Sequence, residues 1–142
     1  GYYLGRGHRE VFSKLGSTLL RLGLLTGVFF LIIYGLGFLK IAAFFTKESL
    51  VHKELYTLIG IMMLSQPLNA LLYVLDGLLF GAAQFQYMKK RMQEGFICFF
   101  LPLLLIGYYY APSLVVIWLA LLAFNLYRLL SNYKRYCGVV NA

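Results

Sequence analysis

The chain has 142 residues, of which 61% are hydrophobic and only 13% are charged. A soluble domain is typically about 45–50% apolar and about 25% charged, so both departures indicate a protein that lies in lipid. The formal net charge is +8. Most basic residues flank apolar runs and form no separate basic domain, which argues against nucleic-acid binding. Cys98 and Cys137 are too few for a disulfide framework and lack metal-ligand spacing.

The first apolar run predicts a transmembrane helix over residues 17–42. No charge occurs between Arg21 and Lys40, and about 20 apolar residues span the hydrocarbon core. Residues 1–14 are polar and are expected to lie on the cytoplasmic side. Because the chain begins with Gly1 and not Met, we expect it to be processed, trimmed or a fragment. Gly23 and Gly27 form a GxxxG pair, which indicates either close helix packing or the general frequency of glycine in membrane helices.

A mixed-charge loop, 46–54, separates this helix from a second predicted transmembrane helix over residues 55–86. This second helix contains Asp76, whose charge at bilayer depth costs at least about 2.5–3.5 kcal/mol. Two interpretations stay open for this acid: it pairs with an Arg or Lys near the basic end of the helix, or it couples transport to a proton or substrate.

The polar residues of the second helix share one face. At about 100° per residue, the face is about 100° wide and contains Gln66, Asn69, Tyr73, Asp76, Gly77 and Gln84. Such a stripe indicates a side turned away from lipid, either toward water or into a structural seam between helices. Pro67 predicts a bend and leaves the carbonyl of Met63 without its usual partner. Ser65 and Gln66 are the neighbouring candidates to satisfy that carbonyl.

The last uncharged run, 95–127, would be roughly 50 Å long as one helix, which exceeds the roughly 30 Å core. Pro112 disfavours helix at Ala111. We therefore predict two helices, over residues 92–110 and 113–130, followed by a polar tail, 131–142, on the cytoplasmic side.

The distribution of basic residues supports four transmembrane helices. Ten then lie on one side: Arg6, Arg9, Lys14, Arg21, Lys89, Lys90, Arg91, Arg128, Lys134 and Arg135. Only Lys40, Lys47 and Lys53 lie on the other. Three helices would give seven against six. The positive-inside bias thus favours an all-α, multipass membrane protein with both ends on the cytoplasmic or equivalent side.

Catalytic patterns are missing from the sequence. It contains no intramembrane zinc motif, no Ser–His pair within a helix and no glycine-rich phosphate loop. We therefore expect no enzyme, no metal site and no cofactor.

Segments 64–70 (LSQPLNA) and 74–82 (VLDGLLFGA) resemble the tenth helix of multidrug and toxic compound extrusion (MATE) transporters. The similarity is greatest to the DinF-like branch, which includes plant plastid members. Segment 44–51 (FFTKESLV) is similar to the family's exit from helix nine, with Glu48 where an aspartate is usual. Segments 111–113 (APS) and 116–119 (VIWL) resemble the start of helix twelve.

The resemblance implies that the chain forms helices nine to twelve, in the C-terminal lobe of a twelve-helix transporter. Such proteins exchange organic solutes or xenobiotics for protons or sodium by alternating access. Gln66, Asn69 and Tyr73 would then line the substrate cavity, Pro67 would supply the bend, and Gly77 and Gly81 would allow close packing. Asp76 would be a gating or structural acid.

The resemblance also bears on the coupling ion and on the membrane. Sodium-coupled members of the NorM type have an acid where this chain has Asn69, and the proton site implied for the DinF-like branch lies in helix one. The expected partners are the lipid bilayer, a small organic solute and the remaining transporter helices. The membrane is the plasma membrane or the plastid envelope, with the plastid favoured. The alternative is a small four-helix membrane scaffold or assembly protein without transport activity.

Overall fold

The computed structural model describes residues 1–45, 49–110 and 113–141, and the side chains of these residues except 38–55. Its elements are α1 (Tyr2–Gly5), α2 (Arg9–Phe45), α3 (Ser49–Gly81), α4 (Phe85–Gly95), the π-helical turn η1 (Phe96–Phe100), α5 (Leu101–Tyr110) and α6 (Leu114–Asn141). The described residues contain no strand.

Within the described residues, four helical stretches are long and apolar enough to cross a membrane: Arg9–Gly37, Tyr56–Gly81, Phe85–Tyr110 and Leu114–Asn141. The predicted all-α membrane fold with four spanning helices is therefore confirmed. The break expected near Pro112 separates α5 from α6, although residues 111–112 themselves lie outside the described part. Glu48, part of the family-like segment before α3, also lies outside it.

The second helix ends earlier than the sequence suggests. We expected it to reach residue 86, but α3 ends at Gly81 and α4 begins at Phe85. Ala83 has a φ of 56°, a left-handed conformation of the kind that commonly ends helices. Consequently Gln84 lies in the connection, and the basic run Lys89–Arg91 forms part of α4, within a helix that starts before the expected residue 92.

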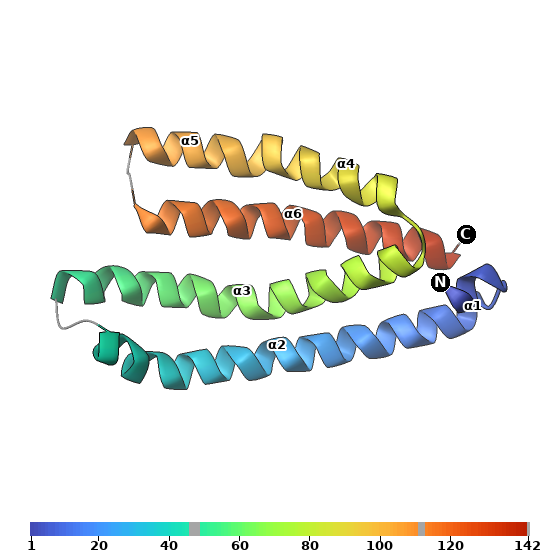
Figure 1. The fold of residues 1–142 in the computed structure, drawn as a ribbon, viewed down its shortest axis with the longest axis horizontal. Helices are drawn as coiled ribbons and strands as arrows, with labels where there is room; N and C mark the ends of the chain where they lie inside the picture. Colours follow the sequence, from blue (N-terminus) through green and yellow to red (C-terminus); the bar gives the residue numbers. More distant parts are fainter. Residues whose placement is uncertain (46–48, 111–112, 142) are drawn as a thin grey trace.

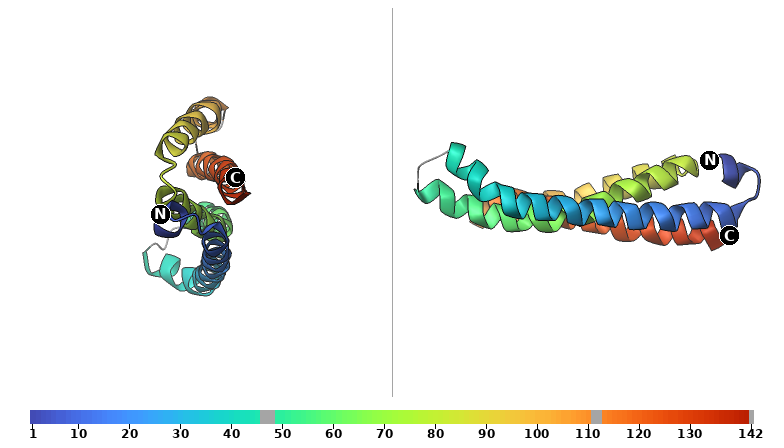
Figure 2. Two further views of the ribbon diagram at one scale, coloured as in Figure 1. Left: turned by 90° about the vertical axis from the view of Figure 1, so that its right-hand side faces the viewer. Right: turned by 90° about the horizontal axis from the view of Figure 1, so that it is seen from below.

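The long helices lie side by side in a curved row, in the order α2, α3, α6 and then α4 with α5 (Figure 2). α3 and α6 run in the same direction, whereas α2 and the α4–α5 stretch run the opposite way (Figure 1). Both chain ends consequently lie at the same end of the molecule, which we call the basic end because the basic segments of α2, α4 and α6 lie there.

α2 approaches α3 closely through its glycines. A Cβ added at Gly27 would lie 2.5 Å from the Cα of Pro67, and one at Gly23 would lie 2.8 Å from Cγ2 of Val74. Only a residue without a side chain fits such spacing, so the GxxxG pair packs two helices together, as one of the two interpretations predicted.

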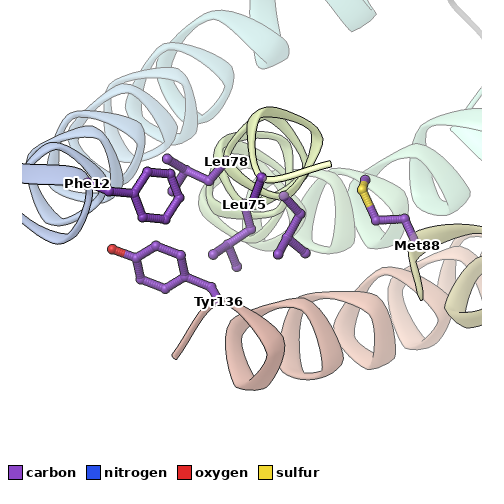
Figure 3. Close-up of a cluster of buried hydrophobic side chains, with 7 residues drawn as sticks. Phe12, Leu75, Leu78, Met88 and Tyr136 are labelled. Atoms are coloured by element: carbon purple, nitrogen blue, oxygen red, sulfur yellow. The ribbon is translucent and has the colours of Figure 1, made fainter. Parts of the chain in front are cut away.

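The buried core lies at the basic end and joins four helices. Phe12 of α2 contacts Tyr136 of α6, with ring centroids 5.9 Å apart (Figure 3). The other members of the cluster are Leu75, Leu78 and Leu79 of α3, Ala82 just after it and Met88 of α4. The hydroxyl of Tyr136 donates a 3.3 Å hydrogen bond to the carbonyl of Ser13. These contacts hold the basic end together and set the positions of α3 and α6.

A π-helical turn joins α4 to α5. Within it the amide of Leu101 donates to the carbonyl of Phe96. Pro102, two residues after the turn, has no amide proton and crowds the carbonyl of Cys98. The wider turn accommodates this proline without breaking the helix, since π turns and prolines are common causes of local distortion.

Candidate functional site

A polar seam lies between α3 and α6, and we define it by five side chains: Asn69, Asp76, Asn125, Arg128 and Asn132. Asn69 and Asp76 are two helical turns apart on α3, as Asn125 and Asn132 are on α6. Two turns advance a helix by about 10.5 Å and return the side chain to nearly the same face. Because the two helices run in the same direction, the two sets meet in order (Figure 1).

Asp76 is held by two side chains of α6. Nη2 of Arg128 donates to Oδ2 of Asp76 at 2.8 Å, and Nδ2 of Asn132 donates to Oδ1 at 2.7 Å. The side chains of Arg128 and Asp76 are only 12% and 15% exposed. Of the two interpretations left open by the sequence, the structure shows the one in which the acid pairs with a basic residue near the basic end.

The seam retains hydrogen-bonding capacity beside this ion pair. Nε of Arg128 and Oδ1 of Asn132 are buried and have no partner among the described residues. A buried polar group without a partner costs about 1–3 kcal/mol, so the site is suited to a bound water or to a polar group from another helix. The Arg128 guanidinium also lies over the Phe124 ring, 5.4 Å from its centroid.

The other end of the seam is neutral. Nδ2 of Asn125 donates a 3.0 Å hydrogen bond to Oδ1 of Asn69. Both residues are half-buried. A pair of amides supplies dipoles but no charge, so this end can orient a polar group but cannot supply a carboxylate for a cation.

Three other residues of the predicted polar face have no contact with the seam, whereas Gln84, in the connection after α3, accepts hydrogen bonds from Arg135 of α6. Tyr73 is 67% exposed, and Gly77 is also exposed, while Gln66 is half-buried and bonds within its own helix. A stripe about 100° wide is broader than the contact made by one neighbouring helix. Asn69 and Asp76, at one edge of the stripe, meet α6, and the other edge remains uncovered.

The surroundings of Pro67 differ in one detail from the expectation. Oγ of Ser65 and Nε2 of Gln66 both donate to the carbonyl of Met62, at 2.7 and 3.2 Å, rather than to that of Met63. The side chains reach back one residue further because Ser65 and Gln66 lie three and four residues after Met62, the spacing at which a helical side chain meets a carbonyl. α3 continues through Pro67 and changes direction in its middle part (Figure 1).

Gly77 has open surroundings, whereas Gly81 lies close to the N-terminal residue Gly1 and to no other helix. A Cβ at Gly77 would meet no described atom within 4 Å, and one at Gly81 would meet only the backbone nitrogen of Gly1, at 3.2 Å. The close helix packing predicted for this pair is therefore not made among the described helices, and it stays a prediction for contacts outside them.

The described residues line cavities of about 300–440 Å³ along the helices, and four of these differ in the polarity of their lining. Two are apolar, one between α5 and α6 and one between α2, α3 and α6. Two are polar and lie at the basic end, one between α4 and α6 and one beside the start of α2. None of these four is lined by Gln66, Asn69 or Tyr73, so the cavity-lining role of these residues also stays a prediction.

The seam residues of α6 were not predicted from the sequence. Asn125, Arg128 and Asn132 fall at spacings of three and four residues, which puts them on one face of a helix. Arg128 entered only the count of basic residues on one side, so this spacing was not used. Among the described residues, no group of three His, Cys, Asp or Glu side chains could hold a metal ion.

Comparison with known proteins gives two similar sequences, both from Arabidopsis thaliana. The chain is 29% identical over 83 residues to Protein DETOXIFICATION 45, chloroplastic. The aligned region covers 58% of this chain and 15% of that protein. It is 36% identical over 75 residues to Protein DETOXIFICATION 42. That aligned region covers 53% of this chain and 15% of that protein. No family model and no solved structure matches the chain.

These two relatives support the relation to the MATE family that the helix motifs indicated. In both cases the match spans only 15% of the relative's length. Together with the four apolar helices, the similarity supports an integral membrane protein.

Proposed function

We propose that this chain is part of a secondary antiporter of the MATE kind, which exports organic solutes across a membrane in exchange for a cation by alternating access. The observation that carries the proposal is the similarity of more than half of the chain to two DETOXIFICATION proteins. The four apolar helices and the polar side chains at membrane depth are compatible with that role.

Within such a transporter the chain would supply helices nine to twelve of the DinF-like branch: α2, α3, the α4–α5 stretch and α6 in order. The open row of helices supports this arrangement. Leu25, Phe29 and Leu36 of α2 are 66%, 58% and 74% exposed, and apolar side chains of this size need cover from lipid or from further helices.

The uncovered edge of α3 is the proposed lining of the substrate cavity. Gln66, Tyr73 and Gly77 lie within about 40° of one another at 100° per residue, and no neighbouring helix packs on Gly77 in the described chain. An aromatic ring beside an amide suits an organic cation or an aromatic solute. Asn69 would contribute from the boundary of the seam, and Gly77 and Gly81 would admit a second helix during closure.

The coupling ion is proposed to be the proton, bound by an acid outside this chain. Asn69 is a neutral amide that is already bonded to Asn125, and Asp76 is already paired with Arg128. Neither offers an unpaired carboxylate for sodium. The plastid envelope is the proposed membrane, since the name of one relative describes it as chloroplastic.

An export assay in the complete transporter tests the proposal. We expect Gln66→Ala, Tyr73→Ala and Pro67→Ala to reduce dye or drug efflux while the amount of protein in the membrane stays normal. Tyr108→Ala is the matched control, because Tyr108 is 75% exposed at the far end of α5 and away from α3. Unchanged export by both Gln66→Ala and Pro67→Ala would overturn the proposal.

The sequence upstream of Gly1 would distinguish this function from that of a small scaffold protein. Extending the reading frame upstream should reveal roughly eight further apolar helices with an internal repeat. An initiator methionine directly before Gly1 would instead favour the scaffold.

A further inference from the structure

A polar groove of about 440 Å³ lies between α4 and α6 at the basic end. Its lining includes Tyr87, Arg91, Tyr127, Ser131, Lys134 and Arg135. It is separate from the polar seam, because it lies on the side of α6 that meets α4 rather than α3. None of its residues takes part in the proposed transport.

The walls of this groove are held by contacts between the two helices. The hydroxyl of Tyr87 donates a 2.8 Å hydrogen bond to the carbonyl of Ser131. Nη1 of Arg91 donates to the hydroxyl of Tyr127 at 3.1 Å and pairs with Glu94 at 2.6 Å. The groove is therefore formed before any ligand arrives, which lowers the ordering cost of binding.

Two guanidinium groups converge on one aromatic ring. Arg91 and Arg135 each lie 5.2 Å from the centroid of the Tyr87 ring. Arg135 also donates two hydrogen bonds to Oε1 of Gln84, at 3.0 and 2.6 Å. Both arginines are thereby positioned, and a planar guanidinium is suited to the oxygens of a phosphate.

The charge of the groove is positive and only partly compensated. Three cations line it, and Glu94 offsets one of them by pairing with Arg91. Arg135 bonds only to a neutral amide, and Lys134 makes no hydrogen bond or ion pair with the rest of the described chain. The groove thus presents two uncompensated cations to a ligand.

The depth of the groove matches the lipid headgroups. The uncharged stretch of the third spanning helix begins at Gly95, and Arg91 lies four residues before it, or about 6 Å along the helix. On α6, Arg128 is the first charged residue after the apolar stretch. Lys134 lies six residues further on, or about 9 Å along the helix. Each headgroup layer is roughly 5–8 Å thick, so Arg91 lies within it and the Cα of Lys134 lies at its outer edge, from which the long side chain reaches the phosphates.

We infer that the groove between α4 and α6 binds the phosphate of an anionic phospholipid headgroup. Basic pockets between membrane helices on the positively charged side bind such headgroups. A soluble phosphate shares the same chemistry, but the depth of the groove favours the lipid. Lys134 contributes its free charge, and Arg91 and Arg135 contribute positioned donors.

Lipid titration of the protein in detergent tests this inference. The readout is the number of phospholipids retained in native mass spectrometry, at one fixed salt concentration because salt screens these charges. We expect phosphatidylglycerol to be retained more strongly than phosphatidylcholine. Lys134→Gln should weaken phosphatidylglycerol retention about fivefold, which corresponds to the loss of one cation near the headgroup.

Lys89→Gln is the matched control, since Lys89 is an exposed lysine of α4 that does not line the groove. It should change retention less than twofold. Equal weakening by both variants would show diffuse attraction and overturn the inference. If inorganic phosphate displaces the lipid at equal concentration, the occupant is a soluble anion and the lipid assignment fails. Unchanged melting temperature of Lys134→Gln without lipid would exclude misfolding as the cause of lost retention.

Discussion

The carboxylate of Asp76 on α3 and the guanidinium of Arg128 on α6 meet at 2.8 Å, joining two helices that run in the same direction. The pair is only 15% and 12% exposed, so each charge depends on the other for the stabilisation that water would otherwise supply. Asn132, which is 2% exposed, donates the second hydrogen bond to the acid. This pairing explains how an acid is tolerated inside an apolar helix.

Asp76→Ala is expected to destabilise the protein by about 3 kcal/mol, at the lower end of the range for a broken buried ion pair. The reason is that Arg128 keeps its charge and loses its partner. Thermal or denaturant unfolding in detergent measures the cost. A double-mutant cycle with Arg128→Gln should give a coupling energy of about 1–3 kcal/mol. Additive costs would mean that the two side chains do not support one another.

The amide pair at the other end of the seam should contribute less. Asn69→Leu or Asn125→Leu alone is expected to cost about 0.6 kcal/mol, and at most about 1.7 kcal/mol, as is typical of hydrogen bonds between membrane helices. Replacing both should cost less than the sum, because neither amide is then left without a partner. The same unfolding assay applies. A loss larger than that of Asp76→Ala would contradict this ranking.

Gly27→Ala is expected to push α2 away from α3. Its Cβ would lie 2.5 Å from the Cα of Pro67, which is backbone and cannot rotate aside. Overpacking of this kind typically costs about 1–3 kcal/mol. Gly60→Ala is the control, because a Cβ there meets no described atom within 4 Å, and it should leave stability unchanged or raise it by up to about 1 kcal/mol. Similar effects of both substitutions would rule out close packing at Gly27.

Cysteine labelling in sealed vesicles can test whether both termini lie on the same side of the membrane. Single cysteines introduced by Tyr2→Cys and Tyr133→Cys, in a background with Cys98→Ser and Cys137→Ser, should react with an impermeant maleimide from the same side. These tyrosines are 64% and 53% exposed at the basic end, whereas Tyr109, 82% exposed, lies in the last turn of α5 at the opposite end. Tyr109→Cys should therefore react only from the other side. Equal labelling of all three positions in intact vesicles would contradict four spanning helices.

Several features of the fold follow from local sequence. The uncharged runs predicted four spanning helices, because lipid tolerates few charges and requires about 20 apolar residues per crossing. The spacing of Gly23 and Gly27 predicted a close approach between helices, which α3 provides. The end of α3 was misplaced, since Ala82–Gln84 contains no glycine, proline or asparagine to indicate a turn.

The sequence predicted the α3 side of the candidate site but not the α6 side. The periodicity of α3 predicted that Asn69 and Asp76 lie on a polar face, and the alternative of an ion pair for Asp76 was among those considered. Helical periodicity cannot identify the partners of Asn69 and Asp76 on α6, because those residues lie more than fifty positions further along the chain. The partners are Asn125, Arg128 and Asn132. Tyr73 and Gln66 share the predicted face with these two residues, but α6 covers only the edge formed by Asn69 and Asp76.

By itself, the sequence determined the all-α class and the four long apolar helices, and it predicted that both chain ends lie on one side. These depend on length, apolarity and charge, which act within each segment. Only the tertiary structure decided that α6 lies beside α3 in the same direction and that Arg128 meets Asp76. Helical periodicity states which residues share a face, but the packing of the whole row decides which helix that face meets.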